Sequence, residues 1–405
     1  MTISTVVVLL IVGLGAVWFL ILPWLWEPHT KPDSRQDECL PGKSKLSKEY
    51  EASESGIVRV IRLTDDGEFV DRCELTDAIY EIRNCRESEL IVWYIHGWKH
   101  NADKEDSDRN NFERLIKKLA EKQSDEGDRR RVVGIYIGWD GAVGPALLRN
   151  LSFWNRKRAA DRISQSSVLT KIFAAIKYAR KQEAGEFTAR DLTIMIGHSF
   201  GARILYTATS QVLIDEVQRR HPGKVKSSYG VIAGPADLIL LLNPALEASV
   251  FTAMHSVRRR DSTWWESIDA RQQALLLAIS SVNDWATGVA FPLGQLLSFA
   301  RRDRQRHTLG NYEHYVTHRL QAAKSSDDSA ATSRFWYDHF ETNGLQLLRI
   351  AKSQSGNPFM VARTTPDIID GHNGIWGEGL TKWMIGFMLE LHKRGSSTEK
   401  GLRLN

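Results

Sequence analysis

The sequence predicts an α/β protein, with a mostly parallel sheet covered by helices on both faces and one transmembrane helix ahead of it. Two observations support this prediction. Short, wholly apolar runs alternate with longer amphipathic stretches, which is typical of buried parallel strands joined by crossover helices. The stretch 3–26 contains no charged side chain, and a helix of that length covers a hydrocarbon core of about 30 Å.

Residues 1–26 are therefore expected to form a single-pass N-terminal anchor. Trp18, Trp24 and Trp26 gather in its second half, where aromatic rings lie in membrane helices. The alternative, a cleaved signal peptide, lacks both a basic residue before the apolar run and a small-x-small cleavage pattern after it. Basic residues follow the span and none precedes it, which favours a cytoplasmic position for the large domain.

The linker and the first half of the large domain follow in order. Residues 27–55 are polar and carry three prolines, so we expect a linker that holds the domain off the bilayer. The domain, 56–393, then begins with apolar strands, each followed by a helical pattern. We expect strand 56–63, helix 75–83, strand 90–95, helix 111–122, strand 132–137 and helix 156–182.

The second half of the domain repeats this alternation. Between its last two strands, residues 285–357 bear Trp and Arg side chains and break the rhythm, so we expect a mostly helical insertion that caps the carboxyl ends of the strands. Residues 394–405 are expected to form a polar tail. We expect strand 192–196, helix 201–217, and strands 237–242, 274–282 and 358–363.

The overall composition excludes several classes of protein. The 405 residues carry 54 Lys and Arg against 49 Asp and Glu, a balance that does not indicate a nucleic-acid partner. Cys39, Cys73 and Cys85 are too few for a disulfide scaffold and have no metal-ligand spacing. We expect free thiols and no metal or other cofactor, with a Cys73–Cys85 bridge as the alternative if the domain is exported.

The sequence Gly197-His198-Ser199-Phe200-Gly201 lies between a predicted strand and a predicted helix. Small residues on either side of a serine permit the tight turn that lifts its hydroxyl out of a sheet as a nucleophile. The backbone N–H of Phe200, at the positive end of the helix, is then a candidate oxyanion donor. The alternative is a turn that uses its glycines only for shape.

A nucleophilic serine needs a histidine base and a carboxylate that orients it. His372 lies in a glycine-bordered loop after the last strand, and Asp284 directly follows strand 274–282, so we assign them as the base and its partner. The alternatives are a surface histidine and a helix N-cap. Asp237 precedes its strand and should lie at the opposite end of the sheet. Other candidates that follow no buried strand directly are Asp261, Asp269, Asp370, His314 and His318.

The turn His96-Gly97-Trp98 follows strand 90–95. Gly97 lets the backbone approach a developing negative charge, and the Trp98 N–H is the candidate for a second oxyanion donor. We interpret His96 as a structural residue behind the nucleophile. The stretch 138–141, GWDG, either lines the floor of the pocket or forms a simple turn.

The segments YIHGWKHNA, GIYIGWDG, FWNRKRAADR and IGHSFGARIL, with Ser before Asp before His in chain order, resemble the alpha/beta-hydrolase superfamily. Within it they are similar to a bacterial group of esterase- and lipase-like serine hydrolases. The resemblance implies the alpha/beta-hydrolase fold, a triad of Ser199, Asp284 and His372, activity on a carboxylic ester, no cofactor, and a place in a bacterial inner membrane.

These expectations combine into a membrane-anchored serine hydrolase with a small-molecule or lipid ester as substrate. The anchor, the basic clusters at 258–260 and 301–306, and the aromatic residues of the expected cap favour an acyl lipid. Thioesterase, amidase and acyltransferase share the acyl-enzyme and remain alternatives. An alternative from a different class is a membrane-tethered binding protein that keeps the hydrolase fold but has no catalytic activity. The sequence indicates no oligomeric state.

Overall fold

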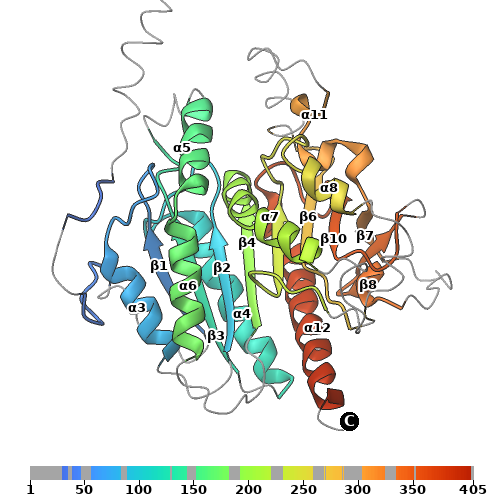
Figure 1. The fold of residues 1–405 in the computed structure, drawn as a ribbon, viewed down its shortest axis with the longest axis horizontal. Helices are drawn as coiled ribbons and strands as arrows, with labels where there is room; N and C mark the ends of the chain where they lie inside the picture. The colour runs from blue at the N-terminus through green and yellow to red at the C-terminus, as the bar shows by residue number, and fades with distance from the viewer. Residues whose placement is uncertain are drawn as a thin grey trace, which may run out of the picture.

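A 10-stranded sheet of order β1-β3-β2-β4-β5-β6-β10-β7-β9-β8 organises the described part of the chain (Figure 1). The computed structural model describes residues 30–34, 39–46, 56–83, 89–127, 130–143, 152–181, 192–219, 231–258, 269, 271–284, 286, 303–323, 334–350 and 353–402. The strands are β1 Ile57–Arg62, β2 Glu89–Ile95, β3 Arg131–Gly138, β4 Leu192–His198, β5 Leu238–Leu242, β6 Leu276–Ser281, β7 His318–Ala322, β8 His339–Thr342, β9 Leu345–Arg349 and β10 Phe359–Thr364.

All pairings from β1 to β7 along the sheet are parallel, and only β7-β9 and β9-β8 are antiparallel. Every residue of β2, β4, β5 and β6 is buried, as expected of central strands that are covered on both faces. The α/β class and the mostly parallel sheet are thus confirmed.

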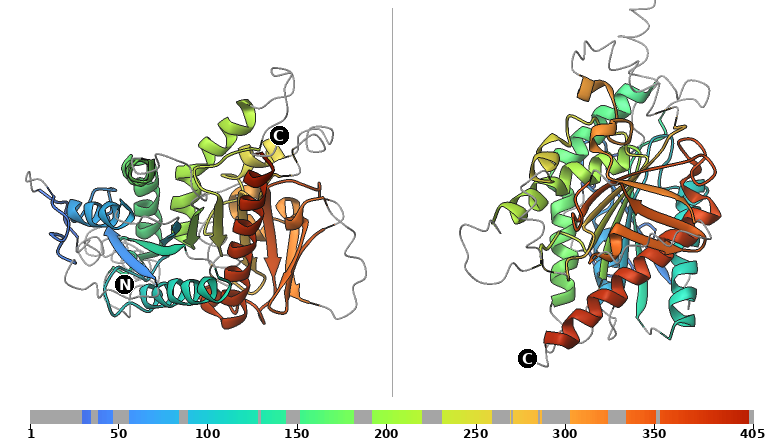
Figure 2. Two further views of the ribbon diagram at one scale, coloured as in Figure 1. Left: turned by 90° about the horizontal axis from the view of Figure 1, so that it is seen from below. Right: turned by 90° about the vertical axis from the view of Figure 1, so that its right-hand side faces the viewer.

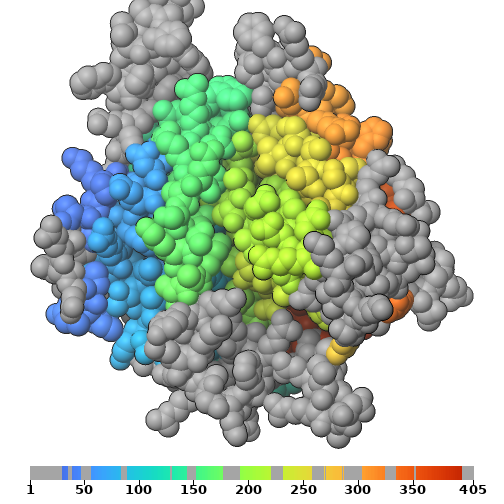
Figure 3. Space-filling model, in the orientation of Figure 1, coloured from blue at the N-terminus to red at the C-terminus, as the bar shows by residue number. Residues whose placement is uncertain are grey.

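Helices cover both faces of the sheet (Figure 2). One face carries α5, α6 and α7, which form the surface seen in Figure 3, and the other carries α4 and α12. The expected helices 75–83, 111–122 and 201–217 are found, each longer than its apolar pattern. The helices are α3 Arg72–Arg83, α4 Ser107–Asp125, α5 Phe153–Gln165, α6 Val168–Lys181, α7 Phe200–Arg219, α8 Thr252–Arg258, α11 Asp303–Arg306 and α12 Glu378–Leu402, with short 3-10 turns η5 Leu309–Asn311, η6 Glu313–Tyr315, η7 Trp336–Asp338 and η8 Gly374–Trp376.

The prediction of a helical insertion over 285–357 is wrong for the part that the structure describes. After α11 the chain adds β7, β8 and β9 to the sheet. β8 and β9 form a hairpin around Asn343 and Gly344, whose φ angles are 51° and 74°. An Asn-Gly pair with positive φ at both positions is the turn that a tight hairpin requires. That dipeptide was the overlooked signal.

Two other boundaries differ from the expectation. The single helix expected over 156–182 is two helices, because Ser166 adopts an extended conformation with ψ 158° and ends α5. Residues 394–402 of the expected polar tail belong to α12, which continues to Leu402.

The described residues of the 27–55 linker lie against the domain and do not hold it at a distance. Thr30 binds Asp140 through two hydrogen bonds, and Asp33 accepts a hydrogen bond of 3.0 Å from the N–H of Arg72 at the start of α3. The remaining described part, 39–46, is attached to α3 through a disulfide and through side chains of that helix.

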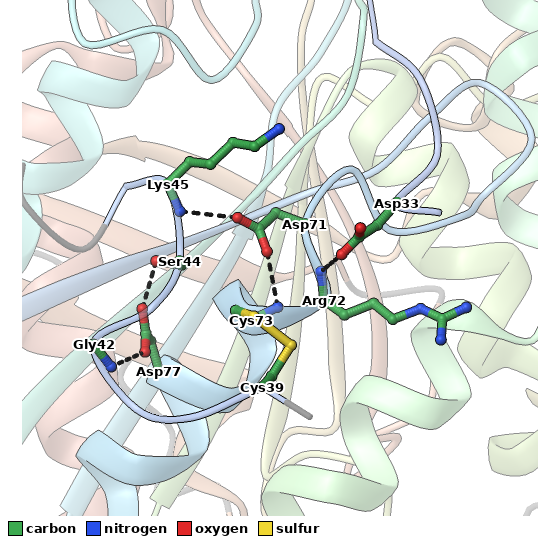
Figure 4. Close-up of a disulfide and its surroundings, with 9 residues drawn as sticks. All are labelled: Asp33, Cys39, Gly42, Ser44, Lys45, Asp71, Arg72, Cys73 and Asp77. Atoms are coloured by element: carbon green, nitrogen blue, oxygen red, sulfur yellow. Dashed lines mark hydrogen bonds between the residues drawn. A yellow bond between two sulfur atoms is a disulfide. The ribbon is translucent and has the colours of Figure 1, made fainter. Parts of the chain in front are cut away.

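Cys39 and Cys73 form this disulfide (Figure 4). The carboxylate of Asp77 accepts hydrogen bonds of 2.6 and 2.5 Å from the Gly42 N–H and the Ser44 hydroxyl. The expectation of free thiols, and its Cys73–Cys85 alternative, are therefore wrong for Cys73. The partner is the cysteine that the docked segment carries to α3, and Cys85 lies outside the described residues.

The expected membrane anchor, residues 1–26, also lies outside the described residues. Within the described ranges, none of the helices combines the length and the apolar character that crossing a bilayer requires.

Candidate active site

Three side chains from distant parts of the chain meet at the carboxyl edge of the parallel strands. Ser199 follows β4, Asp284 follows β6, and His372 follows β10. Because β4, β5, β6 and β10 are successive parallel neighbours, their carboxyl ends lie along one edge, where ligands bind in open α/β sheets.

The backbone at Ser199 makes the tight turn that its glycine neighbours predict. Its φ is 55°, in the left-handed region, which costs energy for a residue other than glycine and is found at functional turns. A Cβ on Gly201 would lie 2.0 Å from the oxygen of Ile95, and one on Gly197 would lie 2.6 Å from the Cα of Ala202. Only glycine allows β2, β4 and α7 to approach this closely.

A continuous chain of hydrogen bonds joins the three side chains. His372 Nε2 lies 2.7 Å from Ser199 Oγ, and His372 Nδ1 lies 2.7 Å from Asp284 Oδ2. A carboxylate only accepts hydrogen bonds, so Nδ1 donates its proton to Asp284 and leaves the Nε2 lone pair to accept from the serine hydroxyl. Ser199 and Asp284 are 3% and 2% exposed, so this chain of bonds is largely shielded from water.

Asn243, which sequence reasoning missed, connects all three segments. Its Nδ2 donates to the oxygens of Gly371 and His372 at 3.1 and 2.8 Å, and its Oδ1 accepts from the N–H of Ser281 at 2.9 Å. Asn243 is fully buried and has φ 41°. Its neighbour Leu242 accepts a hydrogen bond of 3.0 Å from the Ser199 N–H. The signal in the sequence was an asparagine directly after the apolar run 237–242.

His198 also binds the backbone of His372. Its Nε2 donates to the oxygen of His372 at 3.0 Å, and the two rings pack 5.1 Å apart. Burial, followed by the charge of His372, lowers the pKa of His198 to about 4. The residue between Gly197 and Ser199 is thus a neutral donor near neutral pH, and its role extends beyond shaping the turn.

Comparisons with known proteins leave the family open. No family model matches the chain, and no curated protein sequence matches it. Two solved structures show weak similarity: phospholipase PlaB from Legionella pneumophila, at 12% identity and TM-score 0.30, and the same protein in complex with thio-NAD, at 11% and 0.27. The matches cover 77% of this chain and 63% and 61% of those chains. TM-scores this low carry no argument about this protein.

The predicted oxyanion residues, Phe200 and Trp98, belong to the two turns that meet at Ser199. A Cβ on Gly97 would lie 2.7 Å from the Cβ of Ser199, so the turn after β2 lies against the nucleophile. Phe200 begins α7, and backbone N–H groups in a first turn lack an intrahelical partner. The indole of Trp98 donates to Ser152 Oγ at 3.1 Å. The role of the Phe200 and Trp98 N–H groups stays a prediction.

His96 links the ends of β2 and β3. Its Nε2 accepts a hydrogen bond of 2.9 Å from the Trp139 N–H, and its Nδ1 donates to the Gly97 oxygen at 2.9 Å. The ring is fully buried and stacks on Trp139 and Tyr136, and burial lowers its pKa. A neutral histidine with both nitrogens engaged fits the structural role that the sequence predicts for it.

The GWDG stretch contributes a docking residue. Asp140 Oδ2 accepts hydrogen bonds of 3.0 and 2.7 Å from the N–H and hydroxyl of Thr30. Its backbone oxygen accepts one of 2.6 Å from Arg156, which is itself paired with Asp65 inside the protein. Asp140 therefore fastens the segment that follows the expected anchor to the carboxyl edge of the sheet.

The competing acids and histidines make other contacts. Asp370 accepts from Asn283, Asp269 pairs with Arg271, and His318, the first residue of β7, binds Thr317 directly before it. Asp237 accepts from the Thr193 N–H at the start of β4, at the opposite edge from Ser199. His314 is exposed on η6, and Asp261 lies outside the described residues. The described residues contain no cluster of potential metal ligands.

Proposed function

We propose that the chain is a membrane-anchored serine hydrolase of the alpha/beta-hydrolase type that cleaves a carboxylic ester through an acyl-enzyme. The single observation that carries this proposal is the hydrogen-bonded chain from Ser199 through His372 to Asp284. A serine on a strained strand-to-helix turn, with a histidine base and a buried carboxylate, is the arrangement that acyl transfer requires.

The geometry supports a two-step reaction. Ser199 Oγ attacks the ester carbonyl carbon while His372 Nε2 takes the hydroxyl proton, and the carbonyl oxygen becomes an anion that the Phe200 and Trp98 N–H groups stabilise. His372 then gives its proton to the departing alcohol oxygen. Water attacks the acyl-enzyme by the same route, which releases the carboxylic acid and restores Ser199. Throughout, the Asp284 carboxylate accepts the hydrogen bond from the Nδ1–H of His372.

Residues 1–26 supply the proposed membrane anchor, because they form an uncharged stretch long enough to cross a bilayer. Two observations bear on the side of the membrane. The basic residues after this stretch favour the cytoplasm, whereas the Cys39–Cys73 disulfide favours an oxidising compartment. A disulfide is the stronger constraint, since large domains cross membranes regardless of flanking charge. We therefore propose that the domain lies on the oxidising side.

Alkylation of intact cells under non-reducing conditions tests this placement. On the oxidising side, Cys39 and Cys73 react with a maleimide only after reduction. If both react without reduction in freshly lysed cells, the domain lies in a reducing compartment.

Labelling with a fluorophosphonate probe tests the proposed chemistry. We expect the purified protein to be modified at Ser199, and labelling to disappear in Ser199→Ala and to fall strongly in His372→Ala. Turnover of a short soluble ester should decrease by about 10³-fold or more in Ser199→Ala. Equal hydrolysis by the wild type and Ser199→Ala, with both proteins folded, would remove the assignment.

A further inference from the structure

Thr30 fixes the place where the chain leaves the domain toward the expected anchor. Both its N–H and its hydroxyl donate to the same carboxylate oxygen of Asp140, at 3.0 and 2.7 Å. Asp140 is only 8% exposed, and its backbone is held in turn by Arg156. Thr30 is therefore fastened to a buried part of the domain.

Asp140 lies at the same edge of the sheet as the nucleophile. It follows β3 by two residues, and β3 is separated from β4, which ends at His198, only by β2. Neighbouring strands are about 4.8 Å apart, so the ends of β3 and β4 are separated by about 10 Å. In Figure 1 the arrowheads of the parallel strands point to this edge.

The covalent chain limits how far this edge can be from the anchor. The uncharged stretch ends at Trp26 and is followed by residues 27–29 before Thr30. From Trp26 to Thr30 there are four steps of the backbone, which span at most about 14 Å when fully extended. An anchor that ends at Trp26 therefore keeps the carboxyl edge within about 14 Å of the membrane interface.

Side chains at this edge suit a membrane interface. Trp98, Phe153 and Trp154 are partly exposed there, and Lys99 is exposed with its ammonium over the Trp98 ring. Rings with one apolar and one polar end collect at the headgroup level, and lysine and arginine are drawn to anionic lipids. Phe153 also packs against Phe200 at a ring distance of 5.1 Å, so this aromatic surface reaches the first residue of α7 beside Ser199.

We propose that the carboxyl edge of the sheet faces the bilayer, and that the substrates are ester lipids of the same membrane that holds the anchor. This inference rests on the proposed function. Thr30 orients the domain so that an acyl ester enters the Ser199 site from the lipid side, past Trp98 and Phe153. The product acid and alcohol return to the same leaflet or dissolve in water.

Energy transfer from the two ends of α4 to lipid headgroups tests the orientation. Lys104 is exposed in the loop that leads from β2 into α4, at the carboxyl edge, and Asp125 is exposed at the far end of α4. The 19 residues of α4 separate these sites by about 28 Å. A donor dye is attached to Lys104→Cys or Asp125→Cys in a Cys85→Ser background, and the full chain is placed in phosphatidylethanolamine and phosphatidylglycerol vesicles with an acceptor-labelled headgroup.

We expect clearly higher transfer from position 104 than from position 125. Equal transfer, or higher transfer from 125, overturns the orientation while leaving the hydrolase intact. Absence of transfer from both positions overturns the membrane anchor as well. Fluorophosphonate labelling of the same samples at Ser199 reports separately on the proposed chemistry.

Two insertions of equal length test the consequence for lipid substrates. Twelve Gly and Ser residues placed between Pro28 and His29 lengthen the connection from the anchor to Thr30. The same insertion between residues 36 and 37 leaves that connection unchanged. We expect the first to lower hydrolysis of a fluorogenic phospholipid in the same vesicles by about fivefold or more, because effective concentration falls steeply with tether length. The second should stay within twofold of the wild type.

Turnover of a short soluble ester should be the same for both insertions and the wild type. Equal lipid hydrolysis by the two insertion variants overturns the inference. If the wild type itself does not hydrolyse the short soluble ester, the result counts against the proposed function and not against the orientation.

Discussion

The side-chain amide of Asn243 lies 2.8 Å from the backbone oxygen of His372. Because the same side chain accepts a hydrogen bond from Ser281, three residues before Asp284, one residue sets the loop that carries His372 relative to the end of β6. The backbone of Leu242, its neighbour, binds the Ser199 N–H. The relative placement of the three side chains thus depends on the turn at the end of β5.

Asn243→Gly is expected to lower kcat for a soluble ester by about 10- to 100-fold, with KM nearly unchanged. Glycine accepts the φ of 41° at this position, so the main loss is the side-chain bonds that position His372. The remaining bond from His198 limits the effect. Steady-state kinetics and thermal unfolding separate misplacement from unfolding.

The matched control is Asn343→Gly, an exposed asparagine with φ 51° in the β8–β9 turn. Its kinetics should equal those of the wild type. Equal kcat values for the two variants would show that Asn243 does not position the base.

Asp284→Asn is expected to lower kcat by about 10³- to 10⁴-fold. The amide donates where the carboxylate accepted, so it favours the wrong tautomer of His372 and removes the countercharge of the imidazolium. Single-turnover measurements would place the loss in acylation. Asp370→Asn, beside the same histidine but bonded to Asn283, should remain active. The reverse pattern would exchange the two acids.

Gly97→Ala is expected to impair turnover by about 10- to 100-fold, because the new Cβ would lie 2.7 Å from the Cβ of Ser199 and 3.1 Å from His198 Nδ1. The rate of fluorophosphonate labelling measures the effect directly. Gly379→Ala in α12 meets nothing closer than 4.0 Å and should label at the wild-type rate. Wild-type labelling by Gly97→Ala would separate the β2 turn from the nucleophile.

The depressed pKa of His198 predicts a specific sensitivity to acid. Its pKa of about 4 in the folded protein lies below the value of about 6.5 in an unfolded chain. Its stabilising contribution is therefore complete above pH 6.5 and is lost as the pH falls through about 4. Between pH 7.5 and pH 5 this histidine should cost about 2 kcal/mol of folding free energy.

His198→Gln keeps a donor and removes the titration, so it should lose about 2 kcal/mol less stability than the wild type over this range. Urea unfolding at the two pH values measures the difference. Parallel losses in both proteins would mean that His198 titrates normally.

Opening the Cys39–Cys73 disulfide should weaken the fold. The bridge closes a loop with a sequence separation of 34, for which chain entropy predicts a loss of about 3–4 kcal/mol on removal. Urea unfolding of Cys39→Ser under non-reducing conditions measures this loss, and Cys85→Ser is the control. Adding a reductant should destabilise the wild type but not Cys39→Ser. If it destabilises both equally, the effect of the reductant does not come from the Cys39–Cys73 disulfide.

The contrast between β6 and β9 explains which parts of the fold the sequence predicts. β6 is buried along its length, so its apolar run is a direct signal and places Asp284 at the correct edge. β9, between β7 and the edge strand β8, alternates Leu345, Gln346 and Leu347, a short pattern that also fits a helix. The overlooked Asn343-Gly344 dipeptide is the feature that distinguishes a hairpin from a helix here.

The serine elbow was predictable because the turn, the strand and the helix are contiguous in sequence. Asn243 was not, because its partners at Gly371 and His372 are 128 and 129 residues away. The pairing of Cys73 with Cys39 likewise depends on where the segment after the expected anchor docks. Contacts of this kind arise from tertiary packing: the place of Asn243 after an apolar run indicates its edge of the sheet but not its partners.

The two margins of the sheet also bear on how copies of the chain meet. The proposed anchor would hold them at high local concentration on one membrane, where an unprotected strand invites pairing with its counterpart on a neighbour. β1 carries Arg59 and Arg62, each in an ion pair. β8 has only four residues, and its Phe340 packs against Trp383 and Phe387 of α12. Both margins discourage edge-to-edge aggregation.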